Sequence, residues 1–213
     1  MTRLRLTEIF YSIQGESCSV GCPTVFIRLT GCPLRCHYCD TTYAFHQGEW
    51  KNLDDILTDV AQYNAHYVTV TGGEPLAQKS CLVLLKALCD LGYKVSLETS
   101  GALSVAAVDT RVVKIIDIKT PASGEVDKNL FENLEYIQPH DQIKFVVCNQ
   151  ADYEWAKQIL KKYRLTDGCE VLFSPSYMTQ NAGELADWIL KDQLPVRLQI
   201  QLHKYLWGDV PGR

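Results

Sequence analysis

Short apolar runs that are rich in β-branched residues alternate with helical hydrophobic patterns along this chain. The apolar runs predict strands at residues 25–29, 67–71, 95–98, 112–118, 143–148, 171–174 and 197–202. Apolar residues at i, i+3, i+4, i+7 and i+8 predict a helix over residues 53–61, and further patterns predict helices at 80–91, 155–163 and 185–189. Strands that alternate with helices are typical of βαβ units and of a mostly parallel sheet.

Two of the predicted crossovers, at residues 101–111 and 119–142, contain no long amphipathic stripe. A complete eight-stranded barrel usually needs about 250 residues, whereas this chain has 213. We therefore expect an α/β fold, an incomplete, modified (β/α) barrel with about six parallel strands and fewer helices. No repeat or linker divides the chain, so we expect a single domain over residues 1–213. In such folds the reactive groups lie at the carboxyl ends of the strands.

Composition and charge narrow the class of protein. Hydrophobic residues make up 46% and charged residues 22% of the chain, and the net charge is −4. These values exclude a disordered chain, a collagen-like repeat and a strongly basic nucleic-acid binder. We find neither a secretory h-region nor a run of about 18 apolar residues that could cross a membrane. We expect a cytoplasmic protein whose nine cysteines stay reduced, which is more typical of metal binding or catalysis than of disulfides.

Three of the cysteines follow the first predicted strand with the spacing Cys32-x3-Cys36-x2-Cys39. The spacing places three thiols in one loop. A structural zinc site needs four ligands, so zinc would require His37 or His46 as the fourth. An iron–sulfur cluster is the favoured interpretation, and three cysteines would leave one iron open to a substrate or cofactor.

The same spacing is the cluster motif of radical S-adenosylmethionine (SAM) enzymes, and the chain resembles that family. Among its members the chain is most similar to the 7-carboxy-7-deazaguanine synthase family of queuosine (deazapurine) biosynthesis. The segments that carry the resemblance follow the family order from the amino to the carboxyl end: 12–16, 26–32, 39–41, 71–75, 98–101 and 201–206.

The resemblance implies a lyase that converts 6-carboxy-5,6,7,8-tetrahydropterin to 7-carboxy-7-deazaguanine and releases ammonia. The implied cofactors are a 4Fe-4S cluster, SAM and Mg²⁺. The implied partners are the small pterin substrate, an electron donor such as flavodoxin or ferredoxin, and a second copy in a homodimer, with no nucleic acid and no membrane. Two alternatives stay open: a small radical SAM activase of a glycyl-radical enzyme, and a non-enzymatic cysteine-rich zinc module.

The resemblance also assigns roles to individual residues. The cluster would be held by Cys32, Cys36 and Cys39, and Mg²⁺ by Thr41. Residues assigned to SAM are Tyr38, Cys39, Asp40, Gly73, Glu74, Asp117, Ile118, Lys119, Ser174, Pro175, Ser176 and Tyr177. Residues assigned to the substrate are Ile13, Gln14, Gly15, Glu16, Arg28, Thr71 and His203, and Glu98 is the candidate catalytic carboxylate.

The residues themselves give these assignments different weight. Arg28 lies in an apolar run, where a charge is costly unless a partner neutralises it, although a surface-facing strand arginine is an alternative. The glycines at 72 and 73 allow close approach of the backbone to a ligand, but also suit an ordinary turn. A lone His203 is more often a packed residue than a ligand. Ser17 departs from the family, which commonly has a second glycine there, and we treat the nearby Cys18 and Cys22 as non-ligands.

Overall fold

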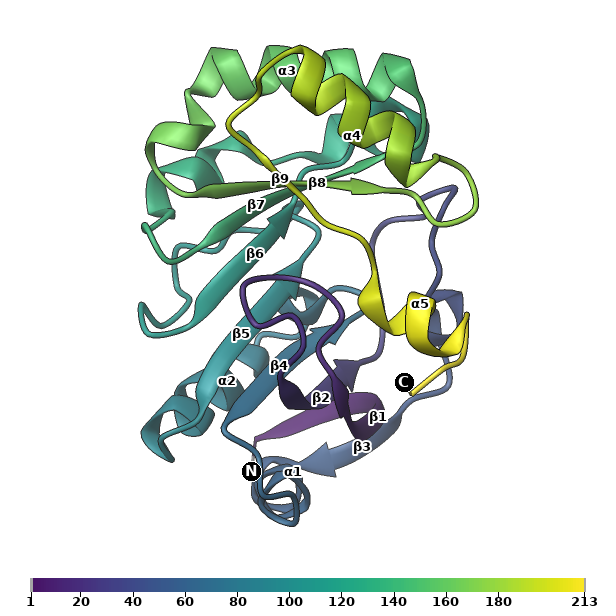
Figure 1. Cartoon of the computed structure of the whole chain (residues 1–213). Coiled ribbons are helices and arrows are strands. Elements are labelled where there is room, and N and C mark those ends of the chain that lie inside the picture. The colour runs from purple at the N-terminus through teal and green to yellow at the C-terminus, as the bar shows by residue number, and fades with distance from the viewer. Residues whose placement is uncertain (1, 213) are drawn as a thin grey trace.

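A computed structural model describes residues 2–212, and in this part of the chain nine strands form one sheet in the order β3-β1-β2-β4-β5-β6-β7-β8-β9 (Figure 1). The strands are β1 Arg3–Ile13, β2 Pro23–Leu29, β3 Glu49–Asn52, β4 Tyr67–Gly72, β5 Lys94–Thr99, β6 Val113–Asp117, β7 Gln142–Val147, β8 Glu170–Pro175 and β9 Arg197–Leu198. The α-helices are α1 Leu53–Ala61, α2 Cys81–Asp90, α3 Gln150–Tyr163, α4 Ala182–Lys191 and α5 Leu202–Trp207. Short 3-10 helices are η1 Thr42–Phe45, η2 Pro75–Ala77, η3 Pro121–Ser123, η4 Val126–Lys128, η5 Phe131–Tyr136 and η6 Leu165–Asp167.

The sheet is parallel from β2 through β9, and β1 and β3 extend it as antiparallel strands at one edge. Within residues 2–212 the edge strands β3 and β9 do not pair with each other, so the sheet is open. The predicted α/β class and incomplete barrel are confirmed. Six parallel strands have five or more residues, and the seventh, β9, has two.

The parallel strands carry apolar residues on one face and polar residues on the other. In β4, Val68 and Val70 belong to the core whereas Thr69 and Thr71 point the other way. The apolar face packs against the helices: α1 on β1 and β3, α2 on β5, α3 on β7, and α4 on β8 and β9 (Figure 1). The polar face is therefore left for the interior of the curved sheet.

No helix of the described residues combines the length and apolar character needed to span a bilayer.

Two irregular segments close that interior. The floor segment, residues 14–22, follows β1 and lies at the amino ends of the parallel strands, where the Cys18 N–H bonds Gln142 Oε1 at 3.0 Å. The C-terminal segment, residues 199–209, follows β9, crosses the open side of the sheet and includes the short helix α5 (Figure 1). The two segments meet, because the Ser17 N–H bonds Gln199 Oε1 at 2.7 Å and the Leu202 N–H bonds the Gly15 carbonyl at 3.0 Å.

The predicted elements agree with the structure except at the two ends of the sheet. Every predicted strand between residues 25 and 174 and every predicted helix matches an observed one. The helix predicted at 80–91 ends just before Gly92, which has φ +86°. The crossovers predicted to lack a long helix contain only turns and the short η3, η4 and η5. Strands β1 and β3 were not predicted. The strand predicted at 197–202 is wrong beyond Leu198, because Gln199 turns toward the floor segment and residue 202 begins α5.

Candidate active site

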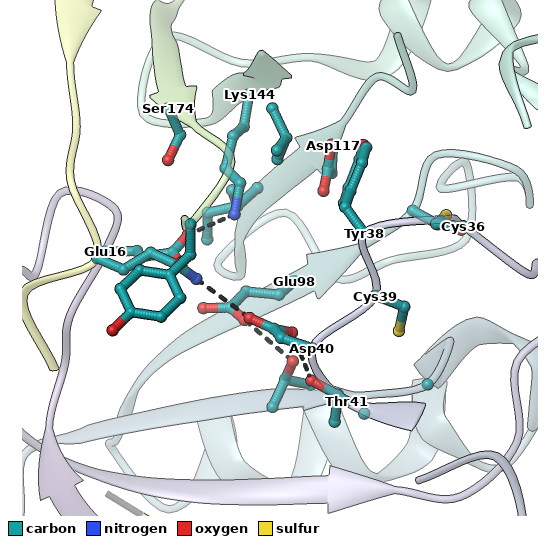
Figure 2. Close-up of a pocket in the computed structure, with 18 of the residues that line it drawn as sticks. Glu16, Cys36, Tyr38, Cys39, Asp40, Thr41, Glu98, Asp117, Lys144 and Ser174 are labelled. Atoms are coloured by element: carbon teal, nitrogen blue, oxygen red, sulfur yellow. Dashed lines mark hydrogen bonds and ion pairs between the residues drawn. The ribbon is translucent and has the colours of Figure 1, made fainter. Parts of the chain in front are cut away.

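A cavity of about 400 Å³ occupies the polar interior of the sheet, above the floor segment and below the loops at the carboxyl ends of the strands. All the predicted site residues line it except Gly15, Glu74 and Ile118. Figure 2 shows the sulfur atoms of Cys36 and Cys39 at one side of the pocket, Glu16 and Lys144 at the other, and Glu98 between them. The structure thus brings together residues that lie up to about 190 positions apart, as a parallel sheet does at one edge.

The cysteine loop leaves β2 and rests on the turn after β4. The Glu74 N–H donates to the Gly31 carbonyl at 2.8 Å. A Cβ at position 73 would lie 2.3 Å from the Gly31 oxygen and 2.9 Å from Cys32 Cβ, so only glycine allows this contact. Gly31 itself has φ +99°, in the region that favours glycine. These two glycines therefore set the height of the cysteine loop above the sheet.

The three cysteines fit an iron–sulfur cluster better than a single zinc ion. Cys32, Cys36 and Cys39 are free and half-buried, and Cys32 Sγ accepts a hydrogen bond from the Leu34 N–H at 3.4 Å. Among residues 2–212 no three cysteine, histidine or acidic side chains converge to hold one metal ion. A cluster has no such need, because each thiolate binds a different iron. Burial raises the pKa of the Cys36 thiol to about 11, so metal binding would have to drive its deprotonation.

His37 and His46, the two candidates for a fourth zinc ligand, are engaged elsewhere. The His37 ring contacts the Ala122 carbonyl through Nδ1 at 3.3 Å and lies against Gly124. The His46 ring packs edge-on against Phe45. Neither contact directs an imidazole toward the three thiols, which leaves the cysteine loop with three candidate ligands.

Two buried polar atoms beside the cysteine loop have no hydrogen-bond partner within residues 2–212: Tyr38 Oη and Asp117 Oδ1. Buried groups of this kind are costly unless something satisfies them. Both residues line the cavity, and the other oxygen of Asp117 accepts from Lys119 Nζ at 2.9 Å. A polar ligand such as a hydroxylated nucleoside would supply the missing partner, so the site fits the predicted SAM contacts of Tyr38, Asp117 and Lys119.

Glu74 faces away from the cavity. Its carboxylate is fully buried and accepts hydrogen bonds from the Thr99 hydroxyl at 2.9 and 3.0 Å, the Ser100 N–H at 2.7 Å, the Ser100 hydroxyl at 2.5 Å and the Leu76 N–H at 2.9 Å. These bonds tie the turn after β4 to the end of β5. The predicted contact of Glu74 with SAM stays a prediction, as does that of Ile118, which lies outside the cavity lining.

Arg28 has the partner that its position in an apolar strand required. Its Nε donates to Glu8 Oε1 at 2.7 Å, and Glu8 also accepts from the Tyr43 hydroxyl at 2.9 Å. The guanidinium lies 5.6 Å from the centre of the Phe10 ring, which stacks on Phe26 with centroids 4.9 Å apart. The ion pair uses Nε, so within residues 2–212 the two Nη groups keep their donors for an anionic ligand in the cavity.

Glu98 lies at the centre of the cavity wall, at the end of β5. Its Oε2 accepts from the Thr71 hydroxyl at 3.0 Å, and Gln14 Nε2 lies 3.4 Å from its Oε1. Gln14 Nε2 also donates to the Thr69 hydroxyl at 3.1 Å, so the buried amide is fixed from two sides. Burial and the nearby Glu16 raise the pKa of Glu98. A carboxyl group held in this way can both anchor a ligand and exchange a proton.

Among the cavity residues to which the sequence assigned no role are Lys144, Gln201 and Lys204. Lys144 pairs with Glu16, and Gln201 Nε2 donates to the other oxygen of Glu16 at 2.9 Å. Lys204 pairs with Asp40 at 2.7 Å, and Asp40 in turn accepts from the Thr41 hydroxyl at 2.8 Å. The strand alternation in β7 could have identified Lys144, whereas nothing local marks the contacts of α5.

His203 lies on α5 and packs against Gly15 rather than following a strand directly. A Cβ at position 15 would lie 2.0 Å from His203 Nδ1, so the glycine makes room for the ring. Burial lowers the pKa of His203, which favours the neutral imidazole at pH 7. His203 lines the cavity, and its predicted contact with the substrate stays a prediction.

An open, mostly parallel sheet with three cysteines in the loop after its first parallel strand defines a site of the radical SAM class, and comparison with known proteins agrees. The sequence description of the Radical SAM superfamily matches residues 26–166. The 7-carboxy-7-deazaguanine synthase of Chlorobaculum tepidum is 47% identical over 208 residues, covering 96% of this chain and 94% of that protein. That of Koribacter versatilis is 42% identical over 219 residues, covering 96% and 97%.

A solved structure gives the same result for the fold. The crystal structure of QueE from Escherichia coli superposes with a TM-score of 0.81 at 23% identity, covering 95% of this chain and 96% of that one. The chain belongs to the radical SAM superfamily and, within it, to the 7-carboxy-7-deazaguanine synthase family.

Proposed function

We propose that this protein is a 7-carboxy-7-deazaguanine synthase of queuosine biosynthesis, a radical SAM lyase that converts 6-carboxy-5,6,7,8-tetrahydropterin to 7-carboxy-7-deazaguanine and ammonia. The two products together contain all the atoms of the substrate, so the overall reaction needs no external oxidant. The observation that carries the proposal is that one cavity joins the three-cysteine loop to the set Gln14, Arg28, Glu98 and His203. An activase of a partner protein would have no use for this second set.

The cysteine loop would hold the 4Fe-4S cluster, with SAM on its open iron and against Tyr38, Asp117 and Lys119. When bound, the cluster and SAM would supply hydrogen-atom abstraction, which no side chain of the protein can perform. The protein's own contribution is to hold the substrate in one orientation and to keep water away.

The substrate side of the cavity suits a flat heterocycle that bears a carboxylate. The stacked rings of Phe10 and Phe26 give an apolar wall. Arg28 offers free guanidinium donors for the carboxylate, and Gln14 offers an amide that matches donor and acceptor positions on a pterin edge. Glu98 is placed to exchange a proton with the ring.

We further propose that the Thr41 hydroxyl is a ligand of a Mg²⁺ ion that also binds the substrate carboxylate. Its proton points to Asp40, which leaves the oxygen lone pairs available. Mg²⁺ commonly keeps several waters and takes few protein ligands, so one hydroxyl suits it. The electron donor is expected to be a flavodoxin or ferredoxin, and the assembly a homodimer. The free thiols suit the reducing cytoplasm.

The test is an anaerobic assay of the reconstituted protein with SAM, Mg²⁺, a low-potential reductant and 6-carboxy-5,6,7,8-tetrahydropterin. We expect the deazaguanine product and ammonia, and strong iron–sulfide absorption before substrate is added. Cys36→Ala should lose iron and activity, while Cys18→Ala should retain both. Product formation by the Cys36→Ala protein, or none by the wild-type protein with a full cluster, contradicts the proposal.

A further inference from the structure

Lys144 is a largely buried cation that lines the cavity. It lies in the middle of β7, opposite Asp117 in the register of β6 and β7, and its side chain is 15% exposed. The side chain points into the cavity and its Nζ forms an ion pair with Glu16 of the floor segment (Figure 2). A buried lysine is costly without a partner, so the pair explains how the charge is tolerated.

Glu16 is fixed by three contacts, of which the ion pair with Lys144 is one. One carboxylate oxygen meets Lys144, the other accepts from Gln201 Nε2 at 2.9 Å, and its backbone N–H donates to Gln14 Oε1 at 3.1 Å. The amide of Gln14 reaches Glu98 at 3.4 Å. A continuous polar chain therefore runs from Lys144 through Glu16 and Gln14 to the candidate catalytic carboxyl.

We propose that Lys144 is a positioning residue that keeps Glu16 as a fixed carboxylate and thereby leaves Glu98, rather than Glu16, to exchange a proton with the substrate. The inference rests on the proposed function, because it concerns the same site and the same substrate. It assigns the two carboxyl groups different tasks: Glu16 accepts hydrogen bonds permanently, and Glu98 changes its protonation state.

The charges around the pair agree with this division. Burial would raise the pKa of Glu16, but the charge and hydrogen bond of Lys144, helped by Gln201 and His203, bring it below the ordinary value. Within the described residues Glu98 forms no ion pair. Burial and the Glu16 charge raise its pKa, and Lys144, Thr71 and Arg28 only partly oppose them. Carboxyl groups whose environments move their pKa values apart are the usual signature of separate roles in acid–base chemistry.

Asp117 of β6 is the remaining charged group that faces Lys144. It interacts with the Lys144 ammonium together with Glu16 and Glu98, and it is itself paired with Lys119 at 2.9 Å. Glu16 of the floor segment, Asp117 of β6 and Arg28 of β2 are therefore the charged groups around Lys144 and Glu98. The titratable His203 of α5 also interacts with Lys144 and Glu16. Without the Lys144 charge, the carboxylates of Glu16 and Glu98 repel each other with nothing to offset the repulsion. One of the two carboxylates should therefore take up a proton at a higher pH than in the wild-type protein.

The experiment measures how Lys144→Met and Glu16→Gln change the titration of Glu98 in the reconstituted enzyme. Lys144→Met should move the Glu98 midpoint up by at least one pH unit, and Glu16→Gln should move it down because the repelling charge is gone. The first readout is infrared absorption of the protonated carboxyl group in substrate-free enzyme, assigned by its loss in Glu98→Gln. The second is the pH profile of kcat/KM, in which the same limb should shift in the same direction.

The controls separate a specific effect from general damage. Lys144→Arg keeps the charge and should keep the titration midpoint. Lys114→Met breaks another buried ion pair, with Asp141 at 2.7 Å, in the neighbouring strand and outside the cavity lining, and should leave the Glu98 titration in place. If Lys144→Met does not load the cluster, the opposite shift in Glu16→Gln tests the proposal alone.

The results distinguish this inference from the function on which it rests. If wild-type enzyme makes no deazaguanine product, the proposed function fails, and the infrared titration still reports whether Lys144 controls the two carboxyl groups. If wild-type enzyme turns over but Lys144→Met and Glu16→Gln leave the Glu98 midpoint within 0.3 pH unit or so of the wild-type value, the inference is overturned.

Discussion

The contact between Gly15 and His203 allows one substitution, Gly15→Ala, to be worked out in detail. A Cβ at position 15 would lie 2.0 Å from His203 Nδ1 and 2.9 Å from the His203 backbone nitrogen. The imidazole can rotate away, but the backbone nitrogen belongs to α5 and is held by the bond from the Leu202 N–H to the Gly15 carbonyl at 3.0 Å. Alanine therefore forces α5 away from the floor segment.

The expected cost combines three effects. Overpacking of this kind costs about 1–3 kcal/mol, loss of the Leu202 hydrogen bond adds about 1 kcal/mol, and the reduced freedom of the unfolded chain returns about 0.4–1 kcal/mol. Gly15 does not have a positive φ, so alanine adds no backbone strain. The free energy of unfolding should therefore fall by about 1–3.5 kcal/mol.

The assay is urea unfolding of the reconstituted protein under anaerobic conditions, followed by tryptophan fluorescence at equal cluster content. Gly168→Ala is the matched control, because a Cβ there would meet nothing closer than 3.9 Å and φ is −105°. Combining Gly15→Ala with His203→Ala removes the contact to the ring but not the one to the backbone. The double variant should lose at least about 1 kcal/mol less than the sum of the single variants. Equal stability of Gly15→Ala and Gly168→Ala, or strictly additive costs, would refute the reasoning.

Three further predictions follow from the same two segments. Ser17 has φ 66°, so Ser17→Gly should stay within about 1 kcal/mol of wild type while Ser17→Val loses more than about 2 kcal/mol in urea unfolding; a tolerated valine contradicts this. Because burial lowers the pKa of His203, the unfolded chain binds a proton first as the pH falls through about 6.5, so stability should fall from about pH 7.5 to about 5.5. His203→Gln should flatten that part of the curve, and an unchanged slope would rule out the histidine as its source. Lys204→Met removes the ion pairs to Asp40 at 2.7 Å and to Asp209 at 3.3 Å. It should speed amide hydrogen exchange at Gly208, whose N–H donates to the Lys204 carbonyl at 2.9 Å, at least about fivefold, whereas exchange in α2 stays constant. Unchanged exchange at Gly208 would mean that the ion pairs of Lys204 do not hold α5 in place.

The hydrophobic pattern predicts the parallel part of the sheet because each strand there is buried on its helix face by apolar residues. It fails for β1 and β3, which form the antiparallel end of the sheet. In β1 the alternation of buried Leu4 and Leu6 with Arg3 and Arg5 is present but short, and charged residues interrupt it. The strand expected at 197–202 fails for another reason: beyond Leu198 the chain finds its partners in the floor segment, about 180 residues away, which no local pattern encodes.

The residues of the candidate site also form two groups: those that a sequence motif identifies and those that only the fold identifies. Residues in motifs, such as Cys32 and Glu98, are found because the residue type and spacing point to a chemistry. Lys144 carries no motif, yet it follows from geometry. In β7, Gln142 and Lys144 alternate with Ile143 and Phe145, as Thr69 and Thr71 alternate with valines in β4, so a lysine on the polar face must enter the cavity. Lys144 could therefore be predicted from the fold and the strand period, because the alternation shows which strand residues lie on the polar face.

In an open sheet, segments outside the strands must fix the distance between the two sides of the sheet. A closed barrel fixes the distance between its strands by hydrogen bonds around the whole ring, but here β3 and β9 do not pair within residues 2–212. The C-terminal segment supplies the missing link, because Gln201 reaches Glu16 at 2.9 Å and Asp40 at 3.3 Å. It thus connects the floor on which the substrate would rest with the loop that would carry the cofactors. Since displacements of about 1 Å between reacting groups can cost two orders of magnitude in rate, changes in this segment should reduce turnover more than they reduce stability.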